Sequence, residues 1–227
     1  MDIGLALELH NMMKISKLKI LLILVAAAIL FFVITFSQKW GVTVAEKTTS
    51  DYTAKVKSIK NNYKLAAKIC PGIIKSLKNG LPELEKNKLN VKINLSYKLM
   101  ADCEAASLHH ADAAMYYKKL IEAEPQVARW HVAFAESSFR ANNIAESLRA
   151  VHLATQLDPK RLEYRLLEAR MLAKSKLYGK AIVAYKGVLK LAPASQTENI
   201  KMELERVIAL KNNAILPTSN EQEVSKP

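Results

Sequence analysis

The side chains that could support catalysis or bind a metal are few in this sequence, and they are poorly spaced for either role. His109 and His110 form the only histidine pair, but adjacent positions on a helix point about 100° apart, so the two rings are not placed to share one metal ion. We interpret both as exposed residues near a turn. The sequence also lacks a glycine-rich phosphate loop, a GxSxG motif and an HExxH motif. We therefore expect no enzyme, no catalytic residues, no metal site and no cofactor.

Cys70 and Cys103 are the only cysteines, and their separation excludes a CxxC redox or metal motif. They would form one disulfide if the domain faces an oxidising compartment. The alternative is that both are small, buried apolar residues. The sequence alone does not decide between these two states.

Long helices are the elements that the composition favours. The 227 residues include only 6 Gly and 7 Pro, and the aromatic fraction is 7%, which is unlike a turn-rich β fold. The formal net charge is +13, and most of the excess Lys follows an apolar segment near the N-terminus. That stretch has few Arg and no interleaved aromatic platform of the kind that stacks bases, so nucleic acid is not an expected partner. We predict an all-α protein.

Three prolines indicate an internal repeat. Pro125, Pro159 and Pro193 lie 34 residues apart, and each follows an Ala-rich, helical stretch. Each proline marks the end of a helix, because proline cannot continue one. A fixed period of this length is typical of a repeating pair of antiparallel helices. With the prolines as position 32, residues 94–193 divide into the units 94–127, 128–161 and 162–193.

The residues at the expected helix crossings are small in every unit. Helix axes approach within about 8–10 Å only where the side chains at the crossing allow it. Positions 8 and 20 of the three units are Ala101, Ala113, Ala135, Ser147, Ala169 and Ala181. Positions 24 and 27, which would fill the space between units, are Tyr117, Leu120, Val151, Ala154, Tyr185 and Val188.

Residues 94–193 resemble three tandem tetratricopeptide repeats. The match is best in the third unit, from Leu177-Tyr178-Gly179-Lys180-Ala181 to Leu191-Ala192-Pro193. The resemblance implies an α-solenoid of three helical hairpins with capping helices at its ends. The sequence departs from the family at Glu168, where an apolar residue is usual, and at the turn position where Gly is common. The three turn residues are Leu108, Asn142 and Lys176.

In this family the first helix of each unit lines a concave groove, and the matching positions predict where a partner binds. They are Leu95, Lys98, Asp102, Ala105, Ala106, Arg129, Val132, Glu136, Phe139, Arg140, Glu163, Leu166, Arg170, Ala173 and Lys174. This mixture suits an extended or helical peptide with acidic and apolar groups. The alternative is that these are ordinary surface residues and that binding uses the convex face or the caps. Of the residues that hold chaperone C-termini in carboxylate-clamp repeats, only Lys98 is matched, so that specialised function is not expected.

Capping segments are expected on both sides of the repeats. Residues 194–212 have apolar side chains at helical spacing and predict a C-terminal capping helix, and the polar residues 213–227 predict a disordered tail. Residues 39–93 predict a basic helical linker or N-terminal cap.

The segment before the repeats carries an apolar stripe over residues 51–70. We expect this stripe to pack on the first repeat, and the alternative is a short coiled coil that makes a homo-oligomer. Pro71 is expected to end the helix, and Pro71, Gly72, Gly80 and Pro82 to mark a broken helical hairpin after it.

An apolar segment near the N-terminus predicts a membrane anchor. The seventeen residues Ile20–Phe36 carry no charge, and at 1.5 Å per residue they span roughly 26 Å of a ~30 Å hydrocarbon core. We predict a short flank at 1–19 and an uncleaved transmembrane helix at 20–38, in preference to a signal peptide cleaved after Ala45. The lysines expected to contact anionic lipid are Lys55, Lys57, Lys60 and Lys64.

Together these patterns predict a single-pass protein of the inner membrane whose repeats face the periplasm, or, as the alternative, the cytoplasm. The predicted function is a membrane-anchored scaffold or assembly factor that binds a polypeptide through the groove. The alternative is a stoichiometric structural subunit of a membrane complex for secretion, pilus assembly or cytochrome maturation.

Overall fold

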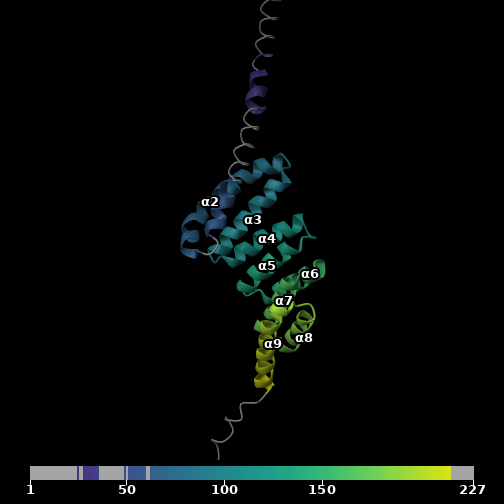
Figure 1. Ribbon diagram of the computed structural model, residues 1–227. Helices are drawn as coiled ribbons and strands as arrows, with labels where there is room; N and C mark the ends of the chain where they lie inside the picture. Colours follow the sequence, from purple (N-terminus) through teal and green to yellow (C-terminus); the bar gives the residue numbers. More distant parts are fainter. Residues whose placement is uncertain (1–24, 26–27, 36–48, 50, 60–61, 216–227) are drawn as a thin grey trace, which may run out of the picture.

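The computed structural model describes residues 25, 28–35, 49, 51–59 and 62–215. Within these ranges the regular secondary structure is α-helical and contains no strand, which confirms the predicted all-α class. Figure 1 shows the labelled helices following one another along one axis, so each packs mainly against its neighbours in the chain.

The helix bounds repeat with the period of the prolines. The labelled helices are α2 (Tyr63–Lys86), α3 (Asn90–Ala106), α4 (His110–Ala123), α5 (Ala128–Arg140), α6 (Ile144–Leu157), α7 (Leu162–Lys174), α8 (Tyr178–Leu189) and α9 (Ala194–Ile215). The first residues of α4, α6 and α8 lie 34 residues apart, and so do those of α5 and α7. The pairs α3–α4, α5–α6 and α7–α8 occupy residues 90–123, 128–157 and 162–189, and α3 begins four residues before the predicted first unit 94–127.

The turns inside these pairs share one hydrogen-bonded geometry. Leu108 has a φ of 67°, its N–H donates to the carbonyl of Ala105 (3.2 Å), and the N–H of His109 donates to the carbonyl of Glu104 (2.9 Å). Two such bonds around a left-handed residue make a Schellman motif. The same bonds and a positive φ recur around Asn142 and Lys176, and also around Lys88 in the turn between α2 and α3. The backbone therefore adopts the conformation that favours Gly, although larger residues occupy these positions.

Leu108→Gly is expected to raise the free energy of unfolding by about 1 kcal/mol, because a non-Gly residue in the left-handed region costs roughly that much. The side chain of Leu108 is exposed, so its removal forfeits little packing. Asn142→Gly is the matched control and should gain less, since Asn tolerates this conformation. Urea denaturation of the two variants measures the difference, and a less stable Leu108→Gly protein would contradict the expectation.

The predicted crossing residues are completely buried. Ala101, Ala113, Ala135, Ser147, Ala169 and Ala181 are each 0% exposed. The hydroxyl of Ser147 on α6 donates to the backbone carbonyl of Ala135 on α5 (2.8 Å), so these two helices are in close contact. The residues predicted to fill the space between units are also buried, namely Tyr117, Leu120, Val151, Ala154, Tyr185 and Val188.

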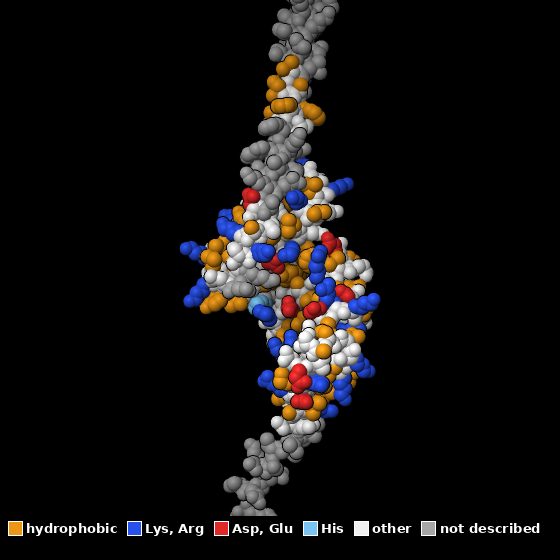
Figure 2. All heavy atoms as spheres, in the orientation of Figure 1, with side chains coloured by type: hydrophobic (Ala, Val, Ile, Leu, Met, Phe, Trp, Pro, Cys, Tyr) orange, Lys and Arg blue, Asp and Glu red, His pale blue; other side chains and the backbone are white. Residues whose placement is uncertain are grey.

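The buried apolar side chains form three clusters along the array. The first joins the helix 51–59 to α2, α3, α4 and the start of α5, and the third joins α7, α8 and α9. The central cluster is the smallest and is built on Ala135, Ala150, Val151 and Met171. Figure 2 shows Lys and Arg side chains spread around the edge of the helical body, with hydrophobic side chains between them.

Helix α2 continues through Pro71 and Pro82, so the prediction that Pro71 ends a helix and that a broken hairpin follows is wrong. A proline in a helix interior costs about 3 kcal/mol. Packing offsets this cost, because a buried Leu or Ile side chain contributes about 1.5–3 kcal/mol. The residues that α2 buries are Ala66, Cys70, Ile73, Ile74, Leu77 and Leu84, whereas both prolines are exposed.

A disulfide joins Cys70 of α2 to Cys103 of α3, with a Cα–Cα distance of 5.4 Å. Both cysteines are buried, so each also fills space in the first cluster. The bond closes a loop of 33 residues and links the segment before the repeats to the first unit.

The apolar stripe over residues 51–70 is divided between two helices. Val56 and Ile59 belong to the helix 51–59 and are buried in the first cluster. Helix α2 then begins afresh, with the side chain of Asn62 accepting a hydrogen bond from the N–H of Leu65 (3.1 Å). Val56 and Ile59 thus pack within the chain, as an N-terminal cap requires.

The predicted single-pass membrane location is corrected. No helix among the described residues is long and apolar enough to cross a bilayer. Of the predicted span Ile20–Phe36, the structure describes residue 25 and the helical residues 28–35. The rest of the segment 20–38, the flank 1–19 and the tail beyond Ile215 lie outside the described residues.

Candidate functional site

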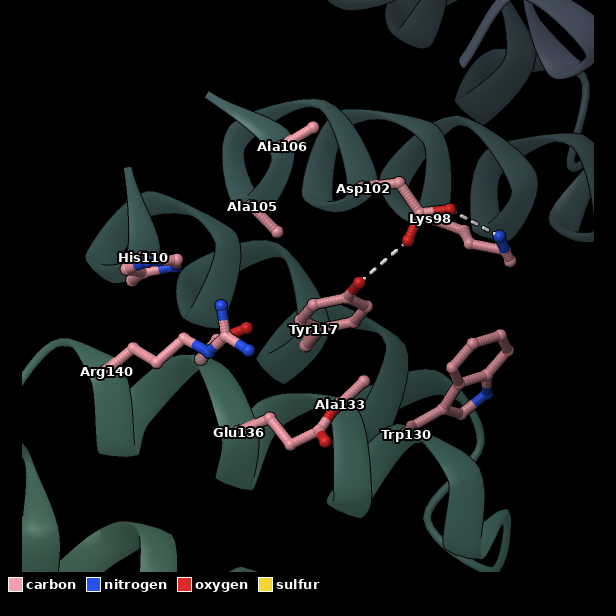
Figure 3. Close-up of a pocket in the computed structure, with 11 residues that line it drawn as sticks. Lys98, Asp102, Ala105, Ala106, His110, Tyr117, Trp130, Ala133, Glu136 and Arg140 are labelled. Atoms are coloured by element: carbon pink, nitrogen blue, oxygen red, sulfur yellow. Dashed lines mark hydrogen bonds and ion pairs between the residues drawn. The ribbon is translucent and has the colours of Figure 1, made fainter. Parts of the chain in front are cut away.

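A cavity of about 440 Å³ lies between α3, α4 and α5. It is lined by Lys98, Asp102, Ala105, Ala106, His110, Tyr117, Trp130, Ala133, Glu136, Ser137 and Arg140. Figure 3 shows His110 and Arg140 at one end, Lys98 and Trp130 at the other, and Tyr117 between them. The cavity is therefore lined by charged, aromatic and small side chains.

Helical spacing explains why these residues share one space. On α3, Lys98, Asp102 and Ala105 are spaced four and three residues apart, which puts them on one face. On α5, Ala133, Glu136 and Arg140 follow the same rule in the opposite order of spacing. The alanines leave the room that the charged and aromatic side chains border.

Asp102 is held by two neighbours inside the cavity. Its carboxylate accepts a hydrogen bond from the hydroxyl of Tyr117 (2.7 Å) and forms an ion pair with Lys98 (2.6 Å). Burial raises the pKa of Tyr117, and the nearby carboxylate of Asp102 raises it further, so the phenol stays protonated as a donor. The three side chains therefore form a preformed network.

Trp130 is fixed at the opposite end from His110. Its indole N–H donates to Glu124 (2.7 Å), whose other carboxylate oxygen accepts from the side-chain amide of Asn94 (2.8 Å). The hydrogen bond from Trp130 and then that from Asn94 lower the pKa of Glu124, which keeps it ionised. The guanidinium of Arg129 lies 4.4 Å from the centre of the Trp130 ring. This end of the cavity is a rigid aromatic wall.

Arg140 and Glu136 present open charges to the cavity. Neither makes a hydrogen bond or ion pair with the residues that the structure describes. His110 lies next to Arg140, and its pKa is lowered by burial and then by the charge of Arg140. His110 is therefore neutral near pH 7, and Arg140 supplies the permanent positive charge at this end.

The predicted groove positions are distributed among several environments. Lys98, Asp102, Ala105, Ala106, Glu136 and Arg140 meet in the cavity. Leu95, Phe139, Leu166 and Ala173 are half-buried and pack against the three apolar clusters. Val132 is half-buried, Lys174 is exposed, and Glu163 borders a separate cavity of about 400 Å³ near the loop before α7.

Arg170 is engaged by the last helix. Its guanidinium donates to Glu203 of α9 (2.9 Å), and the hydroxyl of buried Tyr185 donates to the same carboxylate (2.9 Å). The hydrogen bond from Arg170 is the main cause of the lowered pKa of Glu203. Helix α9 thus covers this part of the third unit, and the open cavity belongs to the first two.

Sequence reasoning did not find Tyr117, Trp130, His110, Ala133 or Ser137 as lining residues. Tyr117 was placed between units as a filler, and it does fill that space while its hydroxyl reaches the cavity. A usable signal was present, because a tyrosine at a filler position needs a polar partner for its hydroxyl.

His109 has acidic neighbours instead of a second histidine. One ligand atom each from Glu104, His109 and Asp112 lie within 4.8 Å of one another, a group with the donor types that a divalent metal uses. His109 Nδ1 is already hydrogen-bonded to Glu104 (2.9 Å). This hydrogen bond therefore links the two residues across the turn between α3 and α4.

No family model matches the chain, and no curated protein matches it either.

Proposed function

We propose that the chain is a tetratricopeptide-like repeat protein that binds another polypeptide in the cavity between α3, α4 and α5. The repeat assignment is supported by the 34-residue recurrence of the helix starts and of the Schellman turns at Leu108, Asn142 and Lys176. It is supported also by the complete burial of all six small crossing residues.

The observation that carries the binding proposal is the open charge of Arg140 within a concave, partly aromatic space. An exposed guanidinium with no carboxylate partner among the described residues is suited to an incoming acidic side chain or terminus. Trp130 and the alanines that line the cavity are suited to an apolar side chain that lies a few residues from the acidic group in the partner. The held groups Asp102 and Tyr117 give this surface a fixed shape, which lowers the entropic cost of binding.

The partner class that fits is a short peptide segment with one acidic and one bulky apolar residue. Glu136 also faces the cavity. Its negative charge disfavours a second carboxylate of the peptide nearby and favours a hydrogen-bond donor such as a backbone amide. A small metabolite is a poorer fit, because no cluster of buried, unpartnered polar atoms converges on the space among the described residues.

Charge reversal at Arg140 tests this proposal. Peptides selected from a random displayed library on the full chain should carry the acidic and apolar pair, and Arg140→Glu should weaken their binding at least about tenfold. Lys174→Glu is the matched control, because Lys174 lies one repeat later and does not line the cavity. Fluorescence anisotropy measures affinity, and circular dichroism checks that helix content is unchanged. Equal binding by the two variants would refute the proposal.

A further inference from the structure

A second and larger cavity, of about 880 Å³, lies between α6, α7 and α8. Its lining includes Arg165, Glu168 and Leu172 of α7. Glu168 is two positions before Arg170, which faces α9, and two positions on a helix differ by about 200°. The second cavity is therefore on the other side of α7, and it shares no lining residue with the first.

Helix α8 presents a face with two glycines, and therefore with little side-chain volume, to this cavity. Gly179, Val183 and Gly187 are spaced four residues apart, which places them along one ridge of the helix. A Cβ atom added at either glycine would meet nothing within 4 Å. Gly is unfavourable in a helix interior, and packing within the described chain does not require it here. Val183, between the two glycines, is 70% exposed.

Apolar side chains extend this ridge across the cavity. Leu148 of α6, Leu172 of α7 and Ala184 of α8 line it, together with the exposed Leu177 at the start of α8. A ridge of small residues allows the backbone of another helix to approach closely, and the neighbouring apolar groups can then pack against its side chains. The shape is thus suited to a helix.

The charge around the cavity is positive. Arg149, Arg165 and Lys180 contribute three cations to the lining. The single carboxylate, Glu168, accepts hydrogen bonds from His152 (2.8 Å) and Thr155 (3.3 Å), so it is satisfied within the chain. This arrangement also explains the departure at Glu168, where the repeat pattern has an apolar residue.

We propose that this cavity is a second docking surface, which receives an amphipathic helix of a partner polypeptide with an apolar row and flanking carboxylates. The apolar row would lie on Gly179, Val183 and Gly187, and the carboxylates would face Arg149, Arg165 and Lys180. Helix α8 has 12 residues and is therefore about 18 Å long, so about three turns of the partner are engaged. This inference does not depend on the function proposed for the first cavity.

Two synthetic peptides of about 18 residues test the proposal, because shorter helices are marginal in water. One carries Leu and Ala along one face and Glu on the flanks, and the other has Lys in place of every Glu. The full chain should bind the Glu peptide at least about tenfold more tightly than the Lys peptide. The double variant Arg165→Glu, Lys180→Glu should reverse that preference. Equal affinities, or a preference that the double variant does not change, would overturn the proposal.

Gly187→Leu separates docking from folding. Leu is a better helix former than Gly, and the space above Gly187 is open, so the variant should unfold no more easily than the parent. It should nevertheless weaken the binding of the Glu peptide at least about tenfold, because the leucine side chain would occupy the ridge. Lys174→Glu, at a residue that lines neither cavity, should leave that affinity unchanged. A stable Gly187→Leu protein that binds normally would exclude the ridge as the docking site.

Two other occupants are distinguishable in the same experiment. If truncation after Ile215 raises the affinity for the Glu peptide at least about tenfold, the tail of the chain itself fills the cavity. If the chain sediments as a dimer that Gly187→Leu converts to a monomer, a second copy fills it. Either result would overturn the assignment to a separate partner.

Discussion

Replacing both cysteines with alanine, as Cys70→Ala and Cys103→Ala, is expected to lower the free energy of unfolding by about 3–4 kcal/mol. The disulfide closes a loop of 33 residues, and opening it returns conformational entropy to the unfolded chain. The bond is also important for α2, because it joins this helix, which contains two prolines, to the first repeat unit. Without the bond, the packing of α2 has to offset its prolines alone.

Thermal unfolding followed by circular dichroism measures this effect. The double variant and the parent protein in reducing agent should unfold at similar temperatures, both below the oxidised parent. The reducing agent should leave the double variant unchanged, which controls for other actions of the reagent. Identical unfolding of the oxidised and reduced parent would contradict the prediction.

Ala135→Leu is expected to destabilise the protein by about 3 kcal/mol, at the upper end for overpacking a core. Ala135 is 0% exposed, and its carbonyl accepts the hydroxyl of Ser147 from α6. A leucine side chain would force α5 and α6 apart and remove the partner of a buried hydroxyl, which itself costs about 1–3 kcal/mol. The central cluster, which contains Ala135, is also the smallest of the three.

Ala145→Leu is the matched control for this substitution. Ala145 is an exposed residue of α6, ten residues further along the chain, and the added atoms there meet solvent. Its effect on the urea midpoint should be close to zero. If Ala135→Leu were as mild as Ala145→Leu, the close approach of α5 and α6 would not be what the buried small residues provide.

The helices of the repeats were predictable because their signals are local and recur. The spacing of three prolines indicates the period, and the small residues at equivalent positions indicate where the helices cross. The path of α2 was not predictable in this way. Pro71 is a strong local signal for a helix end, and the burial of Ile73, Leu77 and Leu84, which outweighs it, depends on tertiary contacts. The membrane location predicted from hydropathy is also corrected, because no helix among the described residues is long and apolar enough to cross a bilayer.

The cavity was only partly predictable. Lys98, Asp102, Glu136 and Arg140 occur at groove positions and do line it. Their different roles follow from contacts that spacing does not encode, because Asp102 is held by Tyr117 whereas Arg140 has no such partner among the described residues. Arg170 occupies an equivalent groove position and is paired instead with Glu203, a residue of the capping helix. A periodic pattern assigns the same role to equivalent positions, and the end of the array breaks that equivalence.

The equal spacing of the helix starts has a consequence for how such a chain can lengthen. The segment 128–161 is one 34-residue unit whose helices α5 and α6 contact α4 before it and α7 after it. A tandem duplication of those residues would keep the 34-residue spacing of the helix starts, which is the spacing that lets successive units stack. One duplication in the gene would therefore add a whole unit, and the disulfide at one end and α9 at the other would stay in place.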